Sequence, residues 1–143
     1  MKPVSPRPLL KPKRLLDPTA PLLGKLGHLE TRLARTKAEI RAAQSVRYRV
    51  FYQELGAIAP PTMKVSRRDK DAFDKHCDHL LVIDRSVGKG NIVGTYRLLL
   101  DDHAGYAGGF YSEGEFDLAP LKTAYRGQRL MELGRSCILP DYR

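Results

Sequence analysis

A carboxylate and a guanidinium stand three residues apart near the end of the chain, in the run MELGRSCI over residues 131–138. On a regular strand Glu132 and Arg135 would face opposite sides, but Gly134 between them permits a bulge, which can bring both side chains to one face. A bulged strand also turns a backbone amide outward. A carboxylate that takes a proton and an amide that binds an oxyanion are what an acyl transfer needs. A plain salt bridge is the commoner explanation of such a pair.

Arg47 is a second candidate, because it falls in the middle of the apolar face of a predicted helix. A guanidinium among apolar neighbours must be paired, since an unpartnered buried charge costs several kcal/mol. We expect either a structural ion pair, with Glu54 further along the same face, or a residue of a functional site.

The densest group of potential metal ligands is His76, Cys77, Asp78 and His79. Consecutive strand residues point to opposite faces, so these four side chains cannot all converge on one ion. We therefore predict a polar entry to a strand and no metal site.

One long helix is predicted to support these residues. Thr36 and Glu39 have the spacing of a capping box, which predicts a helix over residues 37–55 that ends at Gly56. The expected apolar face consists of Ile40, Ala43, Val50, Phe51 and Leu55.

Strands are predicted over residues 26–34, 79–84, 92–100 and 130–139, with a turn at 88–91. A short helix or ordered loop is expected over 62–78, a Gly-rich loop over 105–116 and a helical piece over 118–125. The last strand lies four residues from the end of the sequence, where it would leave a sheet edge uncovered, so we expect the chain to be incomplete.

Composition limits the class of protein. The 143 residues suit one small domain, no apolar run is long enough to span a membrane, and no signal peptide is recognisable, so we expect a cytoplasmic protein. Two cysteines predict reduced thiols. The net charge of +9 predicts an acidic partner, and the absence of any nucleic-acid-binding motif argues against DNA or RNA.

Residues 1–25 form a separate segment, which holds six of the ten prolines and a series of basic residues without periodicity. We expect a disordered basic arm here, either without a role or attracted to anionic lipid headgroups. Residues 26–143 are the predicted folded domain.

Several sequence strings, in order along the chain, resemble the ornithine N-acyltransferase family of ornithine-lipid synthesis. They are RYRVFYQELGA (47–57), DAFDKHCDHLLVID (71–84), IVGTYRLL (92–99), GGFYSEGEFDL (108–118) and MELGRSCILPDYR (131–143). A shorter set is similar to acyl-homoserine-lactone synthases: Arg47 with Phe51, Asp71 with Asp74, Arg97, and Glu132 with Arg135.

The resemblance implies a GNAT-like α/β fold with a mixed, mainly antiparallel sheet flanked by helices, here cut after the fourth core strand and before the phosphate-binding loop. It implies that Glu132 is the base or the carboxylate that orients the amine, and that Cys137 is a core residue. Arg47, Arg97 and Arg135 would hold the acids that shape the site. Asp71, Asp74 and Asp78 would orient these arginines or bind the substrate ammonium.

By the same resemblance, the amine of L-ornithine attacks the thioester of a 3-hydroxyacyl-acyl carrier protein, with no bound cofactor. Arg67 and Arg68 are the residues that we expect to bind the acidic carrier protein, and contact with an anionic membrane is a further expectation. Since the phosphate-binding loop is expected to be missing, we expect weak turnover from these residues alone. The alternatives are a basic interaction module without catalysis and an enzyme similar to acyl-homoserine-lactone synthases.

Overall fold

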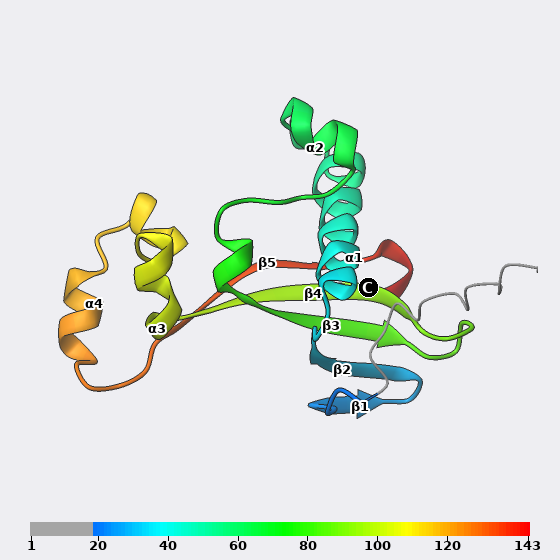
Figure 1. Ribbon diagram of the computed structural model, residues 1–143, viewed down its shortest axis with the longest axis horizontal. Helices are drawn as coiled ribbons and strands as arrows, with labels where there is room; N and C mark the ends of the chain where they lie inside the picture. Colours follow the sequence, from blue (N-terminus) through cyan, green and yellow to red (C-terminus); the bar gives the residue numbers. More distant parts are fainter. Residues whose placement is uncertain (1–18) are drawn as a thin grey trace, which may run out of the picture.

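The computed structural model describes residues 19–143, which form a five-stranded antiparallel sheet with one long helix on a face (Figure 1). Residues 1–18, most of the expected arm, lie outside the described part. Each strand pairs with the next along the chain, in the order β1 (Gly24–Leu26), β2 (Leu29–Leu33), β3 (Asp78–Asp84), β4 (Asn91–Leu100) and β5 (Met131–Ile138). The expected α/β class with a mainly antiparallel sheet is confirmed, and the strands predicted at 79–84, 92–100 and 130–139 are present within a residue or two.

The first predicted strand, over residues 26–34, is confirmed only as β2 at Leu29–Leu33, because the structure has a hairpin where the prediction begins. β1 and β2 pair antiparallel, with Leu26 opposite Leu29. Gly27 turns the chain with φ of 58°, a left-handed conformation that glycine adopts without steric cost. β1 also begins within the segment that was expected to be a disordered arm.

The start of α1 (Lys37–Tyr48) follows the prediction. The Thr36 hydroxyl accepts the Glu39 N–H at 3.2 Å, and the Glu39 carboxylate accepts the Thr36 N–H at 3.3 Å. The same carboxylate pairs with buried Arg32 of β2 at 2.6 Å, which ties the helix start to the sheet. The predicted stop is also confirmed, since Gly56 has φ of 75°.

The second half of the helix departs from the expected pattern. A π-helical segment, Arg49–Glu54, continues directly from α1. Because π-helical hydrogen bonds span five residues instead of four, the side chains rotate away from the face that a 100° step predicts. Val50 remains buried in the core, but Leu55 is 65% exposed, so its predicted place on the apolar face is wrong.

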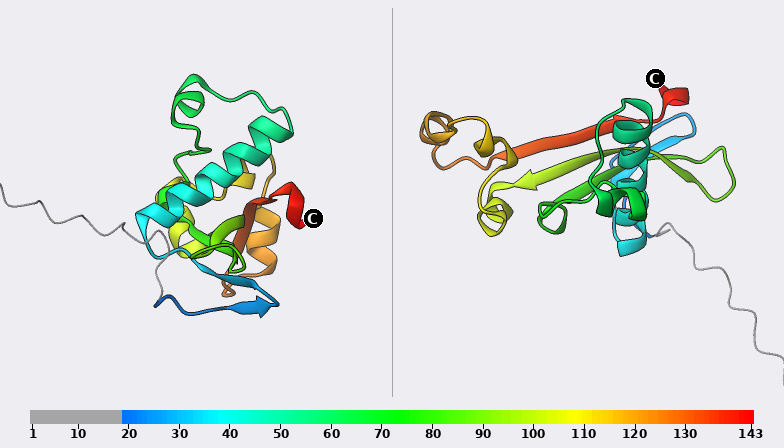
Figure 2. Two further views of the ribbon diagram at one scale, coloured as in Figure 1. Left: turned by 90° about the vertical axis from the view of Figure 1, so that its right-hand side faces the viewer. Right: turned by 90° about the horizontal axis from the view of Figure 1, so that it is seen from above.

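α1 packs across β3, β4 and β5 on one face of the sheet (Figure 2). The core between them is aliphatic and contains Ala43, Val46, Val50, Leu81, Ile83, Ile92, Val93 and Leu139. The chain then passes through α2 (Pro61–Ser66) and a 3-10 turn, Asp74–His76, before it enters β3. This linking segment fits the short helix or ordered loop predicted for 62–78.

A second group of short helices gathers at the far end of β4 and β5, on the left of Figure 1. It contains α3 (Asp101–Ala104), two 3-10 turns (Gly105–Ala107 and Tyr111–Gly114) and α4 (Ala119–Ala124). Leu99, Ala104 and Phe110 form a small core there. The expected Gly-rich loop is therefore partly helical, and the helical piece near 118–125 is confirmed. None of the helices in residues 19–143 combines the length and the apolar character required to cross a membrane.

Candidate active site

β5 carries the bulge that the sequence predicts. Arg97 of β4 faces Gly134, but two residues earlier Thr95 faces Cys137, so β5 has one extra residue between these pairs. The residue with the left-handed backbone is Arg135, with φ of 54°, and not Gly134, the residue whose type suggested the bulge. The bulge is confirmed, whereas the strained position is one residue further along the strand.

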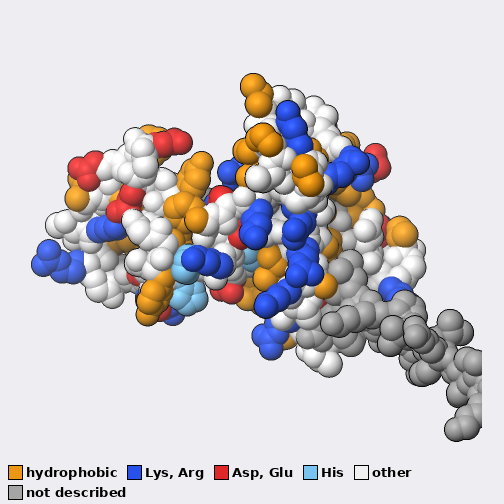
Figure 3. Space-filling model, turned by 45° about the horizontal axis from the view of Figure 1, so that its top comes forward, with side chains coloured by type: hydrophobic (Ala, Val, Ile, Leu, Met, Phe, Trp, Pro, Cys, Tyr) orange, Lys and Arg blue, Asp and Glu red, His pale blue; other side chains and the backbone are white. Residues whose placement is uncertain are grey.

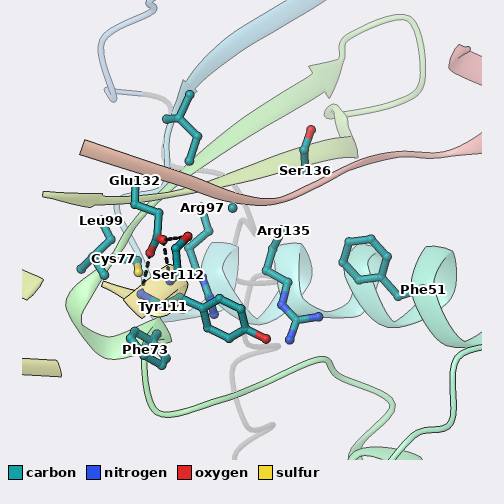
Figure 4. Close-up of a pocket in the computed structure, with 12 residues that line it drawn as sticks. Phe51, Phe73, Cys77, Arg97, Leu99, Tyr111, Ser112, Glu132, Arg135 and Ser136 are labelled. Atoms are coloured by element: carbon teal, nitrogen blue, oxygen red, sulfur yellow. Dashed lines mark hydrogen bonds between the residues drawn. The ribbon is translucent and has the colours of Figure 1, made fainter. Parts of the chain in front are cut away.

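The bulged part of β5 borders a cavity of about 400 Å³, here called the β5 cavity (Figure 4). Glu132 and Arg135 both line it, as does Arg97. The expected convergence of the two β5 side chains is therefore observed. Other walls are apolar or aromatic and include Phe51, Phe73, Leu99 and Tyr111.

Glu132 does not form the ion pair with Arg135 that the simpler explanation required; its carboxylate instead holds a neighbouring turn. It accepts the backbone N–H groups of Tyr111 and Ser112, each at 2.8 Å, and also the Ser112 hydroxyl. A carboxylate can accept about four hydrogen bonds, so capacity remains for a ligand that faces the cavity.

Arg47 is fully buried and paired, but not with Glu54. Its Nε donates to Asp69 at 2.8 Å, and its Nη2 donates to Asp74 at 2.7 Å and to the Asp69 carbonyl at 2.6 Å. Glu54 instead pairs with Arg143 at 2.6 Å. The expected partner was wrong because it was chosen along the helix, whereas the actual acids come from the segment after α2.

The arginines and aspartates join into one network. Arg97 donates to Asp71 at 2.7 Å and lies 3.6 Å from Asp74, the acid that also binds Arg47. Arg135 approaches Asp71 at 3.9 Å. The expected link between these arginines and Asp71 and Asp74 is therefore present in the structure.

Burial and charge shift the pKa values of Asp71 and His79, against the effect of burial for Asp71 and along with it for His79. Burial disfavours charged Asp71, but the hydrogen bond and the positive charge of Arg97 outweigh it, so the Asp71 pKa is lowered. Burial lowers the pKa of His79, whose ring lies 3.5 Å from Arg47 through Nδ1 and 3.0 Å from the Asp74 carbonyl through Nε2. A neutral ring with the proton on Nε2 satisfies both contacts.

Two parts of the site were missed by sequence reasoning. Asp69 is almost completely buried, and besides binding Arg47 it accepts the Tyr52 hydroxyl at 3.1 Å. Tyr111 and Ser112 hold Glu132 from a loop whose string was noted only for its resemblance. The position of Arg47 on the apolar face of the helix indicated that it needs acidic partners. No spacing in the sequence selects Asp69 over its neighbours as one of them.

Three predicted residues, Asp78, Arg67 and Arg68, belong neither to the lining of the β5 cavity nor to the network of arginines and aspartates beside it. Asp78 begins β3 with an exposed side chain, because strand alternation turns it away from buried His79, so its expected part in the network is not observed. Arg67 is exposed at the end of α2.

Arg68 lines a separate groove of about 410 Å³ together with Lys37, Arg41, Lys70 and Lys75, here called the basic groove. Figure 3 shows Lys and Arg side chains gathered along this side of α1. Cys77 borders both the basic groove and the β5 cavity.

The potential metal ligands do not converge. His76 stacks on Tyr106 at 6.4 Å between ring centres, and His79 is engaged in the network. Among residues 19–143, no three His, Cys, Asp or Glu side chains are grouped as metal ligands would be.

Known proteins similar to this chain indicate its family independently of the site. A family model described as an acetyltransferase (GNAT) domain matches residues 46–143. The chain is 52% identical over 134 residues to an L-ornithine N(alpha)-acyltransferase of Rhizobium meliloti, which covers 92% of this chain and 45% of that protein. Proteins of the same name from Agrobacterium fabrum and Brucella abortus are 55% and 49% identical over 125 residues, 85% of this chain and 43% and 44% of theirs.

The chain thus spans a little under half the length of these relatives, and no solved structure matches it at a significant level. The resemblance noted from the sequence strings is confirmed by relatives of that name. The family match covers α1 from Val46 onward and all of β3, β4 and bulged β5, the elements that build the cavity. The chain therefore belongs to the GNAT acetyltransferase family.

Proposed function

We propose that this chain carries the site of an N-acyltransferase that moves a 3-hydroxyacyl group from acyl carrier protein to the α-amine of L-ornithine, in the cytoplasm. The observation that carries the proposal is the β5 cavity, in which a bulged strand brings Glu132 and Arg135 together. Relatives about half identical to the chain are named L-ornithine N(alpha)-acyltransferases, which supports ornithine as the substrate, and the resemblance of the sequence strings supports the acyl carrier protein as the donor.

In the proposed reaction the amine nitrogen attacks the thioester carbonyl carbon directly. The N–C bond forms, the C–S bond breaks, and the carrier-protein thiol leaves with a proton. Glu132 accepts or relays the proton that the amine must lose, and the donors from Tyr111 and Ser112 hold its carboxylate in place. An outward backbone amide near the bulge would bind the oxyanion.

The proposal needs no covalent intermediate on the protein. Burial raises the pKa of Cys77 and of Cys137 to about 11, so both thiols are protonated at neutral pH. A protonated thiol is a poor nucleophile. Cys137 also packs against the aliphatic core, which suits a structural role.

An apolar recess of about 210 Å³ adjoins the β5 cavity and shares Ser112 and Glu132 with it. Phe110, Leu118, Leu121 and Leu130 line this recess. It offers an apolar surface for part of an acyl chain while the carbonyl carbon lies in the cavity.

The basic groove gives the proposal a place for the acidic carrier protein. Arg68 with Lys37, Arg41, Lys70 and Lys75 concentrates positive charge there, whereas the one acid that lines the groove, Asp74, is already paired with Arg47. Charge of one sign in a concave surface attracts and orients a partner of the opposite charge. Arg67, outside the groove, is assigned a smaller contribution.

The test is acyl transfer with defined substrates. The purified chain, and a fusion in which the remaining part of the Rhizobium meliloti relative follows residue 143, are incubated with L-ornithine and carrier protein loaded with a 3-hydroxy fatty acid. We expect N-acylornithine by mass spectrometry, at least from the fusion.

A folded fusion that binds carrier protein but forms no product would contradict the proposal. That outcome would favour the second candidate, a basic interaction module without catalysis, for which the basic groove is the supporting observation.

A further inference from the structure

We propose that Arg135 binds the α-carboxylate of the amine substrate and so selects an α-amino acid, and its α-amine, as the acceptor. The inference rests on the proposed function and names the side chain that recognises the acceptor.

The three arginines of the network differ in their burial and in how many hydrogen bonds their guanidinium groups donate to the aspartates. Arg47 is fully buried and donates at 2.6 to 2.8 Å, and Arg97 is 5% exposed and donates to Asp71 at 2.7 Å. The Arg135 side chain is 28% exposed, and its nearest carboxylate oxygens, on Asp69 and Asp71, lie at 3.8 and 3.9 Å. These separations exceed a hydrogen bond, and although the Tyr52 hydroxyl is a close neighbour of Arg135, the five N–H donors of the guanidinium leave some for a ligand.

Position and shape favour a carboxylate as that ligand. The left-handed backbone of Arg135 directs its side chain into the β5 cavity, where Figure 4 shows the guanidinium between Phe51 and Tyr111. The guanidinium carbon lies 5.7 Å from the Phe51 ring centre and 5.9 Å from that of Tyr111. Rings at this distance hold a guanidinium in place, and its planar fork matches a carboxylate.

The charge of the site complements an acceptor with two amines and one carboxylate. The three arginines and the three aspartates of the network cancel, and His79 is neutral at pH 7 because burial lowers its pKa. Glu132 then leaves one negative charge at the cavity. An α,ω-diamino acid with both amines protonated carries one positive charge, with its carboxylate placed at Arg135 and an amine at Glu132.

This arrangement also fixes which amine reacts. The α-amine and the carboxylate share one carbon atom, whereas the side-chain amine of ornithine lies three methylene groups away. A carboxylate bound at Arg135 therefore holds the α-amine at a fixed short distance within the cavity that Glu132 lines.

The experiment compares three acceptors: L-ornithine, its carboxamide, and 1,4-diaminobutane, which lacks the carboxylate. Arg135→Met is tested in the fusion described above, with Arg126→Met, an exposed arginine on the loop after α4, as the matched control. Hydrogen bonds between charged groups predict that wild type prefers ornithine to the diamine by about 10- to 100-fold in kcat/KM. Arg135→Met should bring this ratio close to one and yield a mixture of α- and δ-acylated products, and Arg126→Met should preserve both.

A structural role for Arg135 would lower all three rates together and leave the ratio and the acylated position unchanged, which would overturn the inference. Arg135→Lys, which keeps the charge but loses the fork, should restore part of the ratio. If wild type acylates none of these amines, the proposed function fails. Calorimetric titration of the purified chain with ornithine and with 1,4-diaminobutane then decides the inference alone, because equal affinities would exclude a carboxylate site.

Discussion

Glu132 has two tasks in the β5 cavity, and they can be separated. Its carboxylate holds the turn at Tyr111 and Ser112, and in the proposed reaction it also receives a proton from the amine. A residue that only held the turn would affect rate through the position of the loop, whereas a base affects rate through its charge.

Glu132→Gln removes the charge but keeps one acceptor oxygen. We expect turnover of the fusion to fall by about 10²- to 10⁴-fold, the range typical of general-base catalysis. One backbone N–H of the exposed turn then faces an amide NH₂ and turns to water, so we also expect a loss of about 0.5–1.5 kcal/mol in the free energy of unfolding. Steady-state kinetics and thermal melts on the same preparation measure both.

Two controls accompany this variant. Glu115→Gln changes an exposed carboxylate and should change neither quantity. Ser112→Ala removes a donor to Glu132 and keeps the charge, so its turnover should fall much less than that of Glu132→Gln. Equal losses of turnover in Ser112→Ala and Glu132→Gln would mean that Glu132 only holds the loop and does not act as a base.

At this scale the sequence predicted types of residues better than their partners. Arg47, Arg97 and Arg135 were identified, as were Asp71 and Asp74. The missing acid, Asp69, sits between Arg68 and Lys70, where a solvated charge is the default expectation. Its pairing with Arg47 depends on how the segment after α2 folds back over α1, and no local pattern encodes that path.

At the scale of elements, the end of β3 is tied to the turn that follows β5. Asp84 accepts the Ser86 hydroxyl and the Tyr142 hydroxyl, each at 2.6 Å. These bonds, first from Ser86 and then from Tyr142, lower the pKa of Asp84 to about 2. Two segments 58 residues apart in sequence are thus joined through one carboxylate.

Asp84→Asn should destabilise the chain at pH 7 by an amount that shrinks with acidity. The unfolded carboxyl titrates near pH 4, about its ordinary value, and the folded one near pH 2. The stabilisation is therefore complete above the unfolded pKa and is lost as pH falls through the folded pKa. Urea unfolding at pH 7, 5, 3 and 2 measures it, with exposed Asp141→Asn as control. A stability difference that stays constant down to pH 2 would contradict the assignment.

Elements with strong local signals were predicted closely, for definite reasons. The capping box at Thr36 and Glu39 and the left-handed glycine at position 56 act within a few residues, so they can be identified from sequence. The β1–β2 hairpin was missed because the residues around Gly27 alternate like one strand, and a lone glycine inside such a pattern also suits a bulge. The π-helical turn has no sequence signature of this kind.

At the scale of the whole molecule, two charged regions differ in burial and in net charge. The network beside the β5 cavity is buried and balanced, whereas the basic groove is open and of one sign. Salt screens exposed charges far more than buried ones, with a Debye length of about 10 Å at 0.1 M and about 3 Å at 1 M. Binding of the donor and the chemistry in the cavity should therefore respond differently to ionic strength.

Charge reversal in the groove tests this separation. Arg68→Glu with Lys70→Glu should raise the apparent KM for acyl carrier protein at low salt and leave KM for ornithine unaltered. As a control, Lys89→Glu with Arg126→Glu makes the same change of net charge elsewhere. Arg67→Glu tests the residue beside the groove. Both variants should raise the apparent KM for acyl carrier protein less than the groove pair does. Initial rates at 0.05 and 0.5 M salt give the comparison. If the control pair raises the apparent KM for acyl carrier protein as much as the groove pair does, net charge alone is responsible and the groove is not the docking site.

The π-helical segment after α1 has a consequence for the history and redesign of the chain. A π turn differs from an α turn by one additional residue, so residues Arg49–Glu54 have the form of a single-residue insertion in an ordinary helix. Deletion of one exposed residue there, such as Gln53, is the smallest edit that could restore a regular helix. The edit would spare the stretch up to Tyr48 and reorient the turn that presents Phe51 to the cavity. The shape of the cavity wall at Phe51 and the regularity of the helix can therefore change through separate mutations, the first by a change of length and the second by changes of residue type.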